Sequence, residues 1–189
     1  MSKLDDALRF AISAHEGMRR KGDGSAYVFH PLEAASIAAT MTTDEDVLCA
    51  AALHDVVEDT PFTSDTIREQ FGERVAELVA SESENKRHGI PSEQTWLIRK
   101  QESLEELAKF DDEGVSIVWL ADKLSNMRSL NRLHESEGEA MWNHFHQKDP
   151  AMHEWYYREI AELTKDLGHH VAWKEYVWLI DQVFGGVEQ

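Results

Sequence analysis

The chain has 189 residues, of which 36 are acidic and 19 are Lys or Arg, so its formal net charge is −17. This length suits one domain with a sizeable core, and 42% hydrophobic with 29% charged residues excludes a wholly disordered chain. The negative charge argues against nucleic acid as the main partner, because that partner requires a cationic surface. An anionic ligand would therefore need a local cation, either a metal or a basic cluster.

The composition and the first residues predict a cytoplasmic protein. The longest apolar runs fall far short of the roughly 20 residues that span a bilayer, so we expect no membrane partner. The sequence opens Met1-Ser2-Lys3 and continues as a polar amphipathic pattern, so we expect no signal peptide. The single cysteine, Cys49, cannot form an internal disulfide, which fits a reducing compartment.

Hydrophobic periodicity predicts helices along nearly the whole chain. Apolar residues recur at three- and four-residue steps from Leu4 to Met18, which indicates a first amphipathic helix before a glycine-rich break. A polar loop is expected over 81–91. Further helices are expected, in chain order, over residues 32–41, 43–58, 63–71, 75–79, 92–110, 115–130, 138–147, 151–167 and 170–184.

The apolar run at residues 115–120 has a strand-like composition. No hairpin signal or alternating partner accompanies it, so we assign it to a helix as well. The sequence therefore predicts an all-α fold of about 8–10 helices. No repeat, low-complexity segment or linker divides the chain, so we expect residues 1–189 to form a single domain.

Charged side chains follow an apolar helical stretch at residues 54–59. His54 and Asp55 come directly after apolar residues, where a charge requires a partner or a metal. On a continuous helix, Glu58 and Asp59 would lie one turn further along the same face. Side chains of this kind gathered on one face would repel one another unless a cation neutralised them.

A second polar position interrupts another apolar helix. Asp122 follows the apolar residues Val118–Ala121, and Asn126 extends the polar face by one turn. The same reasoning therefore applies to Asp122, which we expect to face the same cation. The remaining histidines and the tryptophan-rich C-terminal third are interpreted as ordinary surface or packing residues.

A plain structural interpretation of these residues is also available. It makes His54 a hydrogen-bonded core histidine and places Glu58 and Asp59 at a solvated helix end. For any one residue this interpretation is at least as good as a functional one. The complete set, with an acid in each of two apolar helices, favours a metal site.

The order of these motifs resembles the HD-domain metal phosphohydrolase superfamily. Within it, the sequence is most similar to the hydrolase domain of RelA/SpoT homologues, especially the stand-alone small alarmone hydrolases. The matching segments are Arg19–Lys21, Tyr27–Pro31, Ala51–Thr60, Phe71–Gly72 and Leu120–Arg128. They lie within residues 5–132, whereas residues 133–189 match only loosely and are expected to form a helical, aromatic-rich extension of the same domain.

The resemblance implies a metal centre. Its expected ligands are His30, His54, Asp55 and Asp122. Two imidazoles with two carboxylates suit one borderline divalent ion, and the family uses Mn²⁺. The resemblance makes Glu58 and Asp59 the residues that orient or deprotonate the attacking water.

The resemblance also implies a surface that binds a phosphorylated nucleotide. Its candidate residues are Arg19, Arg20, Lys21, Tyr27, Lys123, Asn126 and Arg128. Asn126 would hold the ribose region, and the basic run at 19–21 would bind phosphates. Cations at the end of a helix also compensate its dipole, which is the plain alternative for this run. Lys123 and Arg128 are weaker candidates.

We therefore expect an Mn²⁺-dependent hydrolase that removes the 3′-pyrophosphate of guanosine tetra- and pentaphosphate (ppGpp and pppGpp), giving GDP or GTP. One rival keeps the fold but acts on another nucleotide, such as an adenosine alarmone or the 2′-phosphate of NADPH. Ala26 and Ser125 depart from the family's usual Pro and His and leave the nucleobase open. Other rivals are a non-catalytic module that binds an alarmone and a purely structural helical protein. The sequence does not indicate an oligomeric state.

Overall fold

A computed structural model describes residues 2–20, 24–87 and 89–185, and these residues form an all-α fold. In this part of the chain no strand is present, and Arg19 and Ala26 form an isolated antiparallel bridge. The α-helices are α1 (Lys3–Ala14), α2 (Phe29–Ala38), α3 (Glu45–Leu53), α4 (Val56–Asp59), α5 (Ser64–Phe71), α6 (Glu73–Glu82), α7 (Ser92–Leu107), α8 (Glu113–Glu137), α9 (Pro150–Leu163) and α10 (Val171–Phe184). The predicted fold class is confirmed, and residues 115–120 are helical.

Short polar side chains cap the first turns of several helices. The Ser2 hydroxyl accepts the Asp5 N–H at 3.1 Å, and the Asp5 carboxylate accepts the Ser2 N–H at the same distance. Asp112 begins α8 by accepting the Gly114 N–H at 2.9 Å, and Asp149 begins α9 in a similar way. These caps fix the starting residues of α1, α8 and α9.

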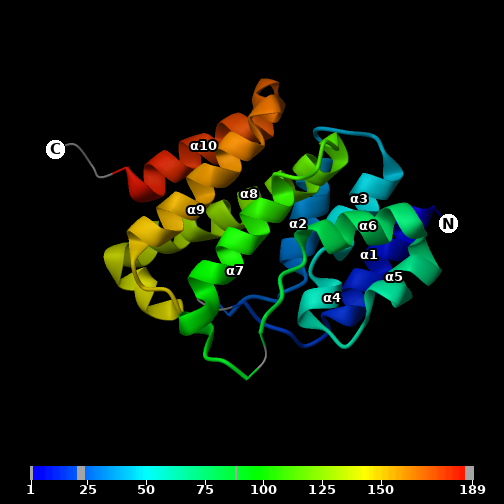
Figure 1. Cartoon of the computed structure of the whole chain (residues 1–189), viewed down its shortest axis with the longest axis horizontal. Helices are drawn as coiled ribbons and strands as arrows, with labels where there is room; N and C mark the ends of the chain where they lie inside the picture. Colours follow the sequence, from blue (N-terminus) through cyan, green and yellow to red (C-terminus); the bar gives the residue numbers. More distant parts are fainter. Residues whose placement is uncertain (1, 21–23, 88, 186–189) are drawn as a thin grey trace.

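Helix α8 is the central element of the fold (Figure 1). It packs most extensively against α2 and α10, and it also contacts α3, α6 and α9. Its side chains Val118, Leu120 and Leu124 are fully buried. Because this burial removes much apolar area from water, α8 is the stable support on which the other helices are placed. Polar groups on its inner face are consequently surrounded by protein.

The helix expected over 43–58 is broken, and this expectation was wrong. Helix α3 ends at Leu53, a turn follows at His54 and Asp55, and the short helix α4 begins at Val56. The His54 Nδ1 atom donates to the Ala51 carbonyl at 2.8 Å, and a continuing helix would use that carbonyl for the Asp55 N–H. The turn changes the direction of the chain at the point where the predicted ligands lie.

The C-terminal third continues the hydrophobic core of the N-terminal part. Ile160 of α9 and Tyr176 and Ile180 of α10 are fully buried in the same cluster as α8. The Trp142 ring stacks on His153, with 4.9 Å between ring centroids. Most of these aromatic residues therefore serve packing, as predicted.

Several helix boundaries differ from the expectation. Helix α8 continues to Glu137, and the start of the helix expected over 138–147 is instead the 3₁₀-helix η1 (Gly138–His144). The helix expected over 151–167 ends early, and the 3₁₀-helix η2 (Lys165–His169) follows it. Such tight turns are common where a helix ends or two helices are joined. No helix within the described residues has the length and apolar character needed to cross a membrane.

Candidate functional site

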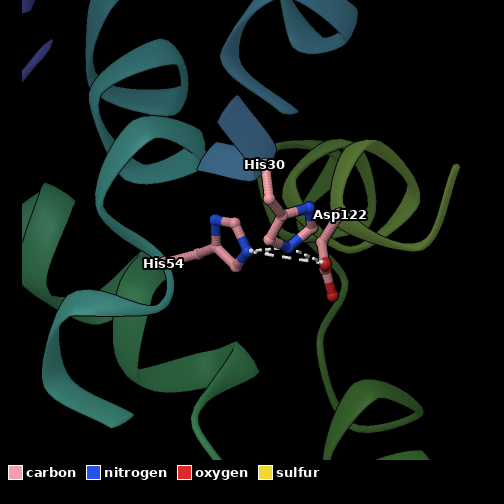
Figure 2. A group of neighbouring side chains, drawn as sticks. All are labelled: His30, His54 and Asp122. Atoms are coloured by element: carbon pink, nitrogen blue, oxygen red, sulfur yellow. Dashed lines mark hydrogen bonds and ion pairs between the residues drawn. The ribbon is translucent and has the colours of Figure 1, made fainter. Parts of the chain in front are cut away.

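Three buried side chains from separate segments converge at the centre of the fold (Figure 2). His30 lies in the first turn of α2, His54 directly follows α3, and Asp122 lies in the middle of α8. The two imidazole Nε2 atoms are 3.1 Å apart. The Asp122 Oδ1 atom is 2.9 Å from His30 Nε2 and 3.4 Å from His54 Nε2.

Asp55 completes this group from the turn between α3 and α4. Its Oδ2 atom is 3.3 Å from His30 Nε2 and 3.2 Å from His54 Nε2. The structure thus brings together the four residues predicted as metal ligands. Their role as ligands stays a prediction.

The outer nitrogen of each imidazole is already used. His54 Nδ1 faces the Ala51 carbonyl, which only accepts, so this nitrogen carries the hydrogen. His30 Nδ1 lies 2.8 Å from the Ser125 hydroxyl, and that hydroxyl donates to Glu33 at 2.7 Å. Ser125 therefore accepts from His30, and both neutral imidazoles turn an Nε2 lone pair inward.

When both imidazoles are neutral, four lone pairs meet at one point. Two Nε2 atoms and one oxygen each from Asp55 and Asp122 are mutual acceptors, and acceptors this close repel unless a cation lies among them. Burial lowers the pKa of His54, but the Asp55 and Asp122 carboxylates outweigh it and raise this pKa well above its ordinary value. The field that favours a proton here also favours a divalent cation. The donor set therefore fits a metal ion, and His30, His54 and Asp122 alone place three ligand atoms within 4.8 Å.

Glu82 forms a second possible metal-binding group with His54 and Asp55, again with ligand atoms within 4.8 Å of one another. Lys123 contacts both Glu82 Oε1, at 2.6 Å, and Asp122 Oδ2, so it does not separate the two groups. The Glu82 group contains one imidazole, whereas the other group contains two imidazoles and keeps Asp122 Oδ1 turned toward them. The arrangement around His30, His54, Asp55 and Asp122 is thus the better candidate for a metal.

Two carboxylates stand beside the metal-ligand group on α4. Glu58 Oε2 accepts the Glu84 N–H at 3.2 Å, and Glu58 Oε1 lies 3.3 Å from Lys86 Nζ. The same ammonium group contacts Asp59 Oδ1. Burial, and then the charge of Asp55, raise the pKa of Glu58 above its ordinary value. Both carboxylates therefore lie on α4 beside the candidate centre, and their role in catalysis stays a prediction.

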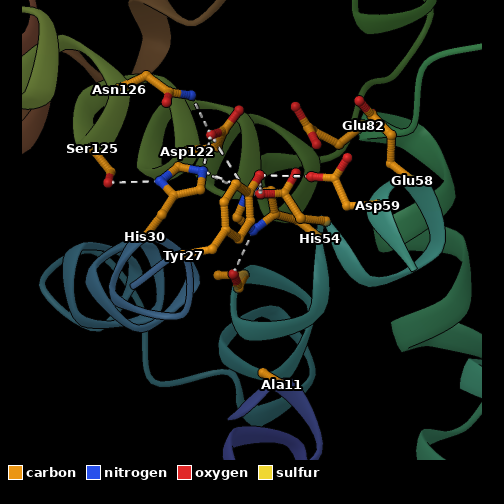
Figure 3. A network of polar contacts seen from close by, with 12 residues as sticks. Ala11, Tyr27, His30, His54, Glu58, Asp59, Glu82, Asp122, Ser125 and Asn126 are labelled. Carbon is orange, nitrogen blue, oxygen red and sulfur yellow. Dashed lines mark hydrogen bonds and ion pairs between the residues drawn. The ribbon is translucent and has the colours of Figure 1, made fainter. Parts of the chain in front are cut away.

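Tyr27 joins these carboxylates to the metal-ligand group (Figure 3). Its hydroxyl oxygen is 2.7 Å from Asp55 Oδ2 and 2.7 Å from Asp59 Oδ2. Burial and the two negative charges raise the pKa of Tyr27 well above its ordinary value, so the phenol keeps its hydrogen. The predicted substrate contact of Tyr27 is not what this geometry favours.

A groove of about 310 Å³ adjoins the metal-ligand group. Asn126 is the link between them, since its amide donates to Asp122 Oδ1 at 2.7 Å and accepts from Arg20 at 2.9 Å. Residues that line the groove include Arg20, Asn126, Leu130, Arg132, Leu133 and Tyr157. Its mixture of apolar, polar and cationic walls can receive an organic anion such as a nucleotide.

Two predicted substrate-binding cations lie in ion pairs within the protein. Lys123 is 7% exposed, and its ammonium group contacts Glu82 and Asp122. Burial lowers the pKa of Lys123, but these two carboxylates outweigh it and raise the pKa well above its ordinary value. Arg128 lies 2.7 Å from Glu175 and 3.1 Å from Glu33. Both positions favour structural contacts over contact with substrate.

The basic run at 19–21 is only partly visible in the site. Arg20 lines the groove, whereas Arg19 is exposed and contacts the Gly24 carbonyl at 3.4 Å. Lys21 lies outside the described residues. Arg20 is thus the member of the run that the structure brings next to Asn126.

Sequence reasoning missed several residues around the site. Ser125 and Glu33 orient His30, Glu82 holds Lys123, and Lys86 contacts both carboxylates of α4. Each partner comes from a different helix or loop, so no local spacing revealed the contact. The one sequence signal was the position of Ser125 beside Asp122 in an apolar helix.

Comparison with known proteins identifies the family. A protein-family model described as HD domain matches residues 7–149. The chain belongs to the HD domain family. The residues matched include every predicted metal ligand, so the convergence described above lies within this HD domain.

Curated relatives of this HD domain differ in how much of their own length the chain covers. A guanosine-3′,5′-bis(diphosphate) 3′-pyrophosphohydrolase from Haemophilus influenzae is 38% identical over 123 residues, covering 65% of this chain and 18% of that protein. The enzyme MESH1 of the same name from Mus musculus is 40% identical over 134 residues, covering 69% of this chain and 71% of MESH1. The chain thus spans about a fifth of the bacterial relative but matches most of the murine one.

Solved structures show the same fold. One, described as a metazoan orthologue of SpoT that hydrolyses ppGpp, has a TM-score of 0.76 at 26% identity and covers 96% of this chain and 95% of its own. A Listeria monocytogenes structure has a TM-score of 0.70 at 30% identity, covering 82% of this chain and 94% of its own. The likeness therefore includes α9 and α10 as well as the segments that contain the candidate ligands.

Proposed function

We propose that this HD domain binds one divalent cation and hydrolyses the 3′-pyrophosphate of ppGpp and pppGpp, releasing pyrophosphate and GDP or GTP. The observation that carries this proposal is the meeting of four acceptor atoms beside a groove with a cationic wall. The Haemophilus influenzae and Mus musculus relatives carry the name of this activity, which supports the choice of substrate.

The cation we propose is Mn²⁺, held by His30, His54, Asp55 and Asp122. Imidazole and carboxylate ligands together suit a borderline divalent ion of this kind. When bound, such an ion polarises phosphoryl oxygens and makes water a better nucleophile near neutral pH. Substrate binding and proton transfer are assigned to the side chains of the protein itself.

The α4 carboxylates are assigned the proton of the attacking water. Glu58 is the stronger candidate base, because its raised pKa brings it closer to neutral pH than an exposed glutamate. Lys86 contacts Glu58 and Asp59 and holds both carboxylates in place. The attacking water would thus lie between α4 and the metal ligands.

The nucleoside end of the substrate is assigned to the groove. Arg20 and Asn126 lie where the groove meets the metal ligands, so they are placed at the junction of sugar and phosphates. Arg20 offers a planar cation for phosphate oxygens, and Asn126 offers an amide for the ribose. The apolar side chains Leu130 and Leu133 give the base a surface to lie on.

We further propose that residues 1–189 act as one hydrolase domain in a reducing, cytoplasmic setting. The shared core of α8, α9 and α10 supports one domain, and the buried thiol of Cys49 supports the setting. The expected partner is a small nucleotide; a nucleic acid or membrane partner is not proposed.

Product analysis tests this function. Purified protein is incubated with ppGpp, an adenosine alarmone and NADPH, each with Mn²⁺ or with a chelator, and the products are separated by ion-exchange chromatography. We expect pyrophosphate and GDP from ppGpp only with the metal. Failure to release pyrophosphate under either condition overturns the proposal, and phosphate release from NADPH alone would reassign the substrate.

A further inference from the structure

Tyr27 is fixed next to the candidate site through both its backbone and its ring. Its N–H donates to the Met18 carbonyl at 3.0 Å, inside the turn that joins α1 to α2. Its ring stacks on the buried His15 ring, with 5.2 Å between centroids, and meets the His30 ring edge-on at 5.9 Å. A side chain held in this way presents its hydroxyl at a defined point.

That point lies between two carboxylates with different proposed roles. Asp55 Oδ2 faces the imidazole nitrogens, whereas Asp59 belongs to α4 and contacts Lys86 through its other oxygen. The Tyr27 oxygen is 2.7 Å from each of the two carboxylates (Figure 3). The hydroxyl therefore bridges a candidate metal ligand and a candidate proton acceptor.

The number of hydrogens limits what this bridge can do. A phenol has one hydrogen, so it donates to one carboxylate at a time. The other 2.7 Å contact becomes favourable only when that carboxyl carries a hydrogen or the local negative charge is neutralised. Both short contacts of the hydroxyl are made to protein, which leaves it little capacity to bind a substrate.

We propose that Tyr27 is a positioning residue that holds Asp59 in place against Asp55. The hydroxyl donates its single hydrogen to Asp55 Oδ2 or to Asp59 Oδ2, and the Lys86 ammonium group offsets the negative charge of Asp59 from its other side. The proton of the attacking water goes to the α4 carboxylates, of which Glu58 is the stronger candidate, and no bond of Tyr27 breaks. The catalytic half of this inference rests on the proposed hydrolysis, and the effect on Asp55 rests on the proposed binding of the cation.

The test compares Tyr27→Phe with Tyr156→Phe in the full chain. Tyr27→Phe keeps the ring that stacks on His15 and removes only the bridging hydroxyl. Tyr156→Phe is the matched control, because the Tyr156 hydroxyl is buried without a hydrogen-bond partner among the described residues. For each protein, kcat and KM on ppGpp, the Mn²⁺ Kd by calorimetry, and the melting temperature in chelator are measured.

We expect Tyr27→Phe to lower kcat and raise the Mn²⁺ Kd, each by about tenfold or more, with KM nearly unchanged. Tyr156→Phe should match the wild type in all three, and both variants should melt near the wild-type temperature in chelator. A raised KM with unchanged kcat would make Tyr27 a substrate contact and overturn the proposal, and so would wild-type values of kcat and Kd. If the wild type releases no pyrophosphate, the proposed function fails, and the Mn²⁺ Kd of Tyr27→Phe still decides whether the hydroxyl supports Asp55.

Discussion

The Ser125 hydroxyl lies 2.8 Å from His30 Nδ1 and fixes which nitrogen of that imidazole carries the hydrogen. Because the hydroxyl gives its own hydrogen to Glu33, it can only accept from His30. The Nε2 lone pair of His30 is thereby committed to the candidate metal centre. A residue outside the candidate ligand group thus sets which nitrogen of His30 is available to a metal.

Replacing this hydroxyl should weaken the metal centre. In Ser125→Ala, the His30 ring loses the partner that orients it, so we expect the Mn²⁺ Kd to rise about 10- to 100-fold. Calorimetric titration of metal into chelator-treated protein measures this change. Ser116→Ala, on the same helix, serves as the control and should bind metal like the wild type; equal affinities for all three proteins would contradict the assignment.

Asp122 should be needed for the metal itself. Removing its carboxylate in Asp122→Ala leaves the two imidazoles and Asp55, so we expect the purified variant to lose most of its bound metal and its turnover. Elemental analysis measures the metal, and the stabilisation that Mn²⁺ gives the folded wild type should also disappear. Glu69→Ala removes an exposed acid from α5 as the control. A full complement of metal in Asp122→Ala would show that Asp122 is not a ligand.

Glu58 should affect rate and its pH dependence without affecting metal. As pH falls through the raised pKa of Glu58, the carboxylate takes a proton and can no longer accept one, so kcat should fall on the acid side at a pH above the ordinary value of 4.5. Glu58→Gln should lose about 10²- to 10⁴-fold in kcat, retain its metal and lack this acid limb. Rate profiles with metal analysis test both points, and an unchanged acid limb in Glu58→Gln assigns it to another group.

His153 should make the fold less stable in acid. Burial lowers its pKa in the native state, while the unfolded chain titrates near about 6.5, so below that pH the unfolded state binds a proton that the native state does not. The contribution of His153 to the free energy of unfolding should thus fall as pH drops below about 6.5. Urea unfolding should show a smaller fall for His153→Gln than for the wild type, whereas His169→Gln, an exposed control, should follow the wild type.

The sequence was sufficient to predict most of the helices and to select the four residues that meet at the candidate metal centre. Apolar periodicity is strong because each helix buries one face, and an acid such as Asp122 is conspicuous inside an apolar run. It was not sufficient to predict the turn at His54 and Asp55. The apolar pattern continues from α3 into α4, and the bond from His54 Nδ1 to the Ala51 carbonyl depends on the folded position of the imidazole.

The roles of individual cations were also beyond the sequence. Lys123 and Arg128 lie next to a specific motif and carry the right charge for phosphate, but charge alone does not reveal which acid each one meets. In the fold, Glu82 of α6 forms an ion pair with Lys123, and Glu175 of α10 forms an ion pair with Arg128. Lys86 is the opposite case, a cation of the site that the sequence analysis did not select. It lies in a polar loop with no motif, and nevertheless its ammonium group contacts both carboxylates of α4.

The ion pairs of Arg128 have a consequence for the C-terminal helix. Glu175 of α10 contacts Arg128, Arg128 contacts Glu33, and Glu33 accepts the hydrogen of the serine that orients His30. Docking of α10 and binding of a cation at the candidate centre would therefore both favour the same orientation of the His30 imidazole. Such coupling is reciprocal. If docking of α10 raises the affinity for the cation by some factor, binding of the cation raises the equilibrium constant for docking of α10 by the same factor. If the candidate centre binds a cation, a helix that supplies none of its ligands is thermodynamically linked to it.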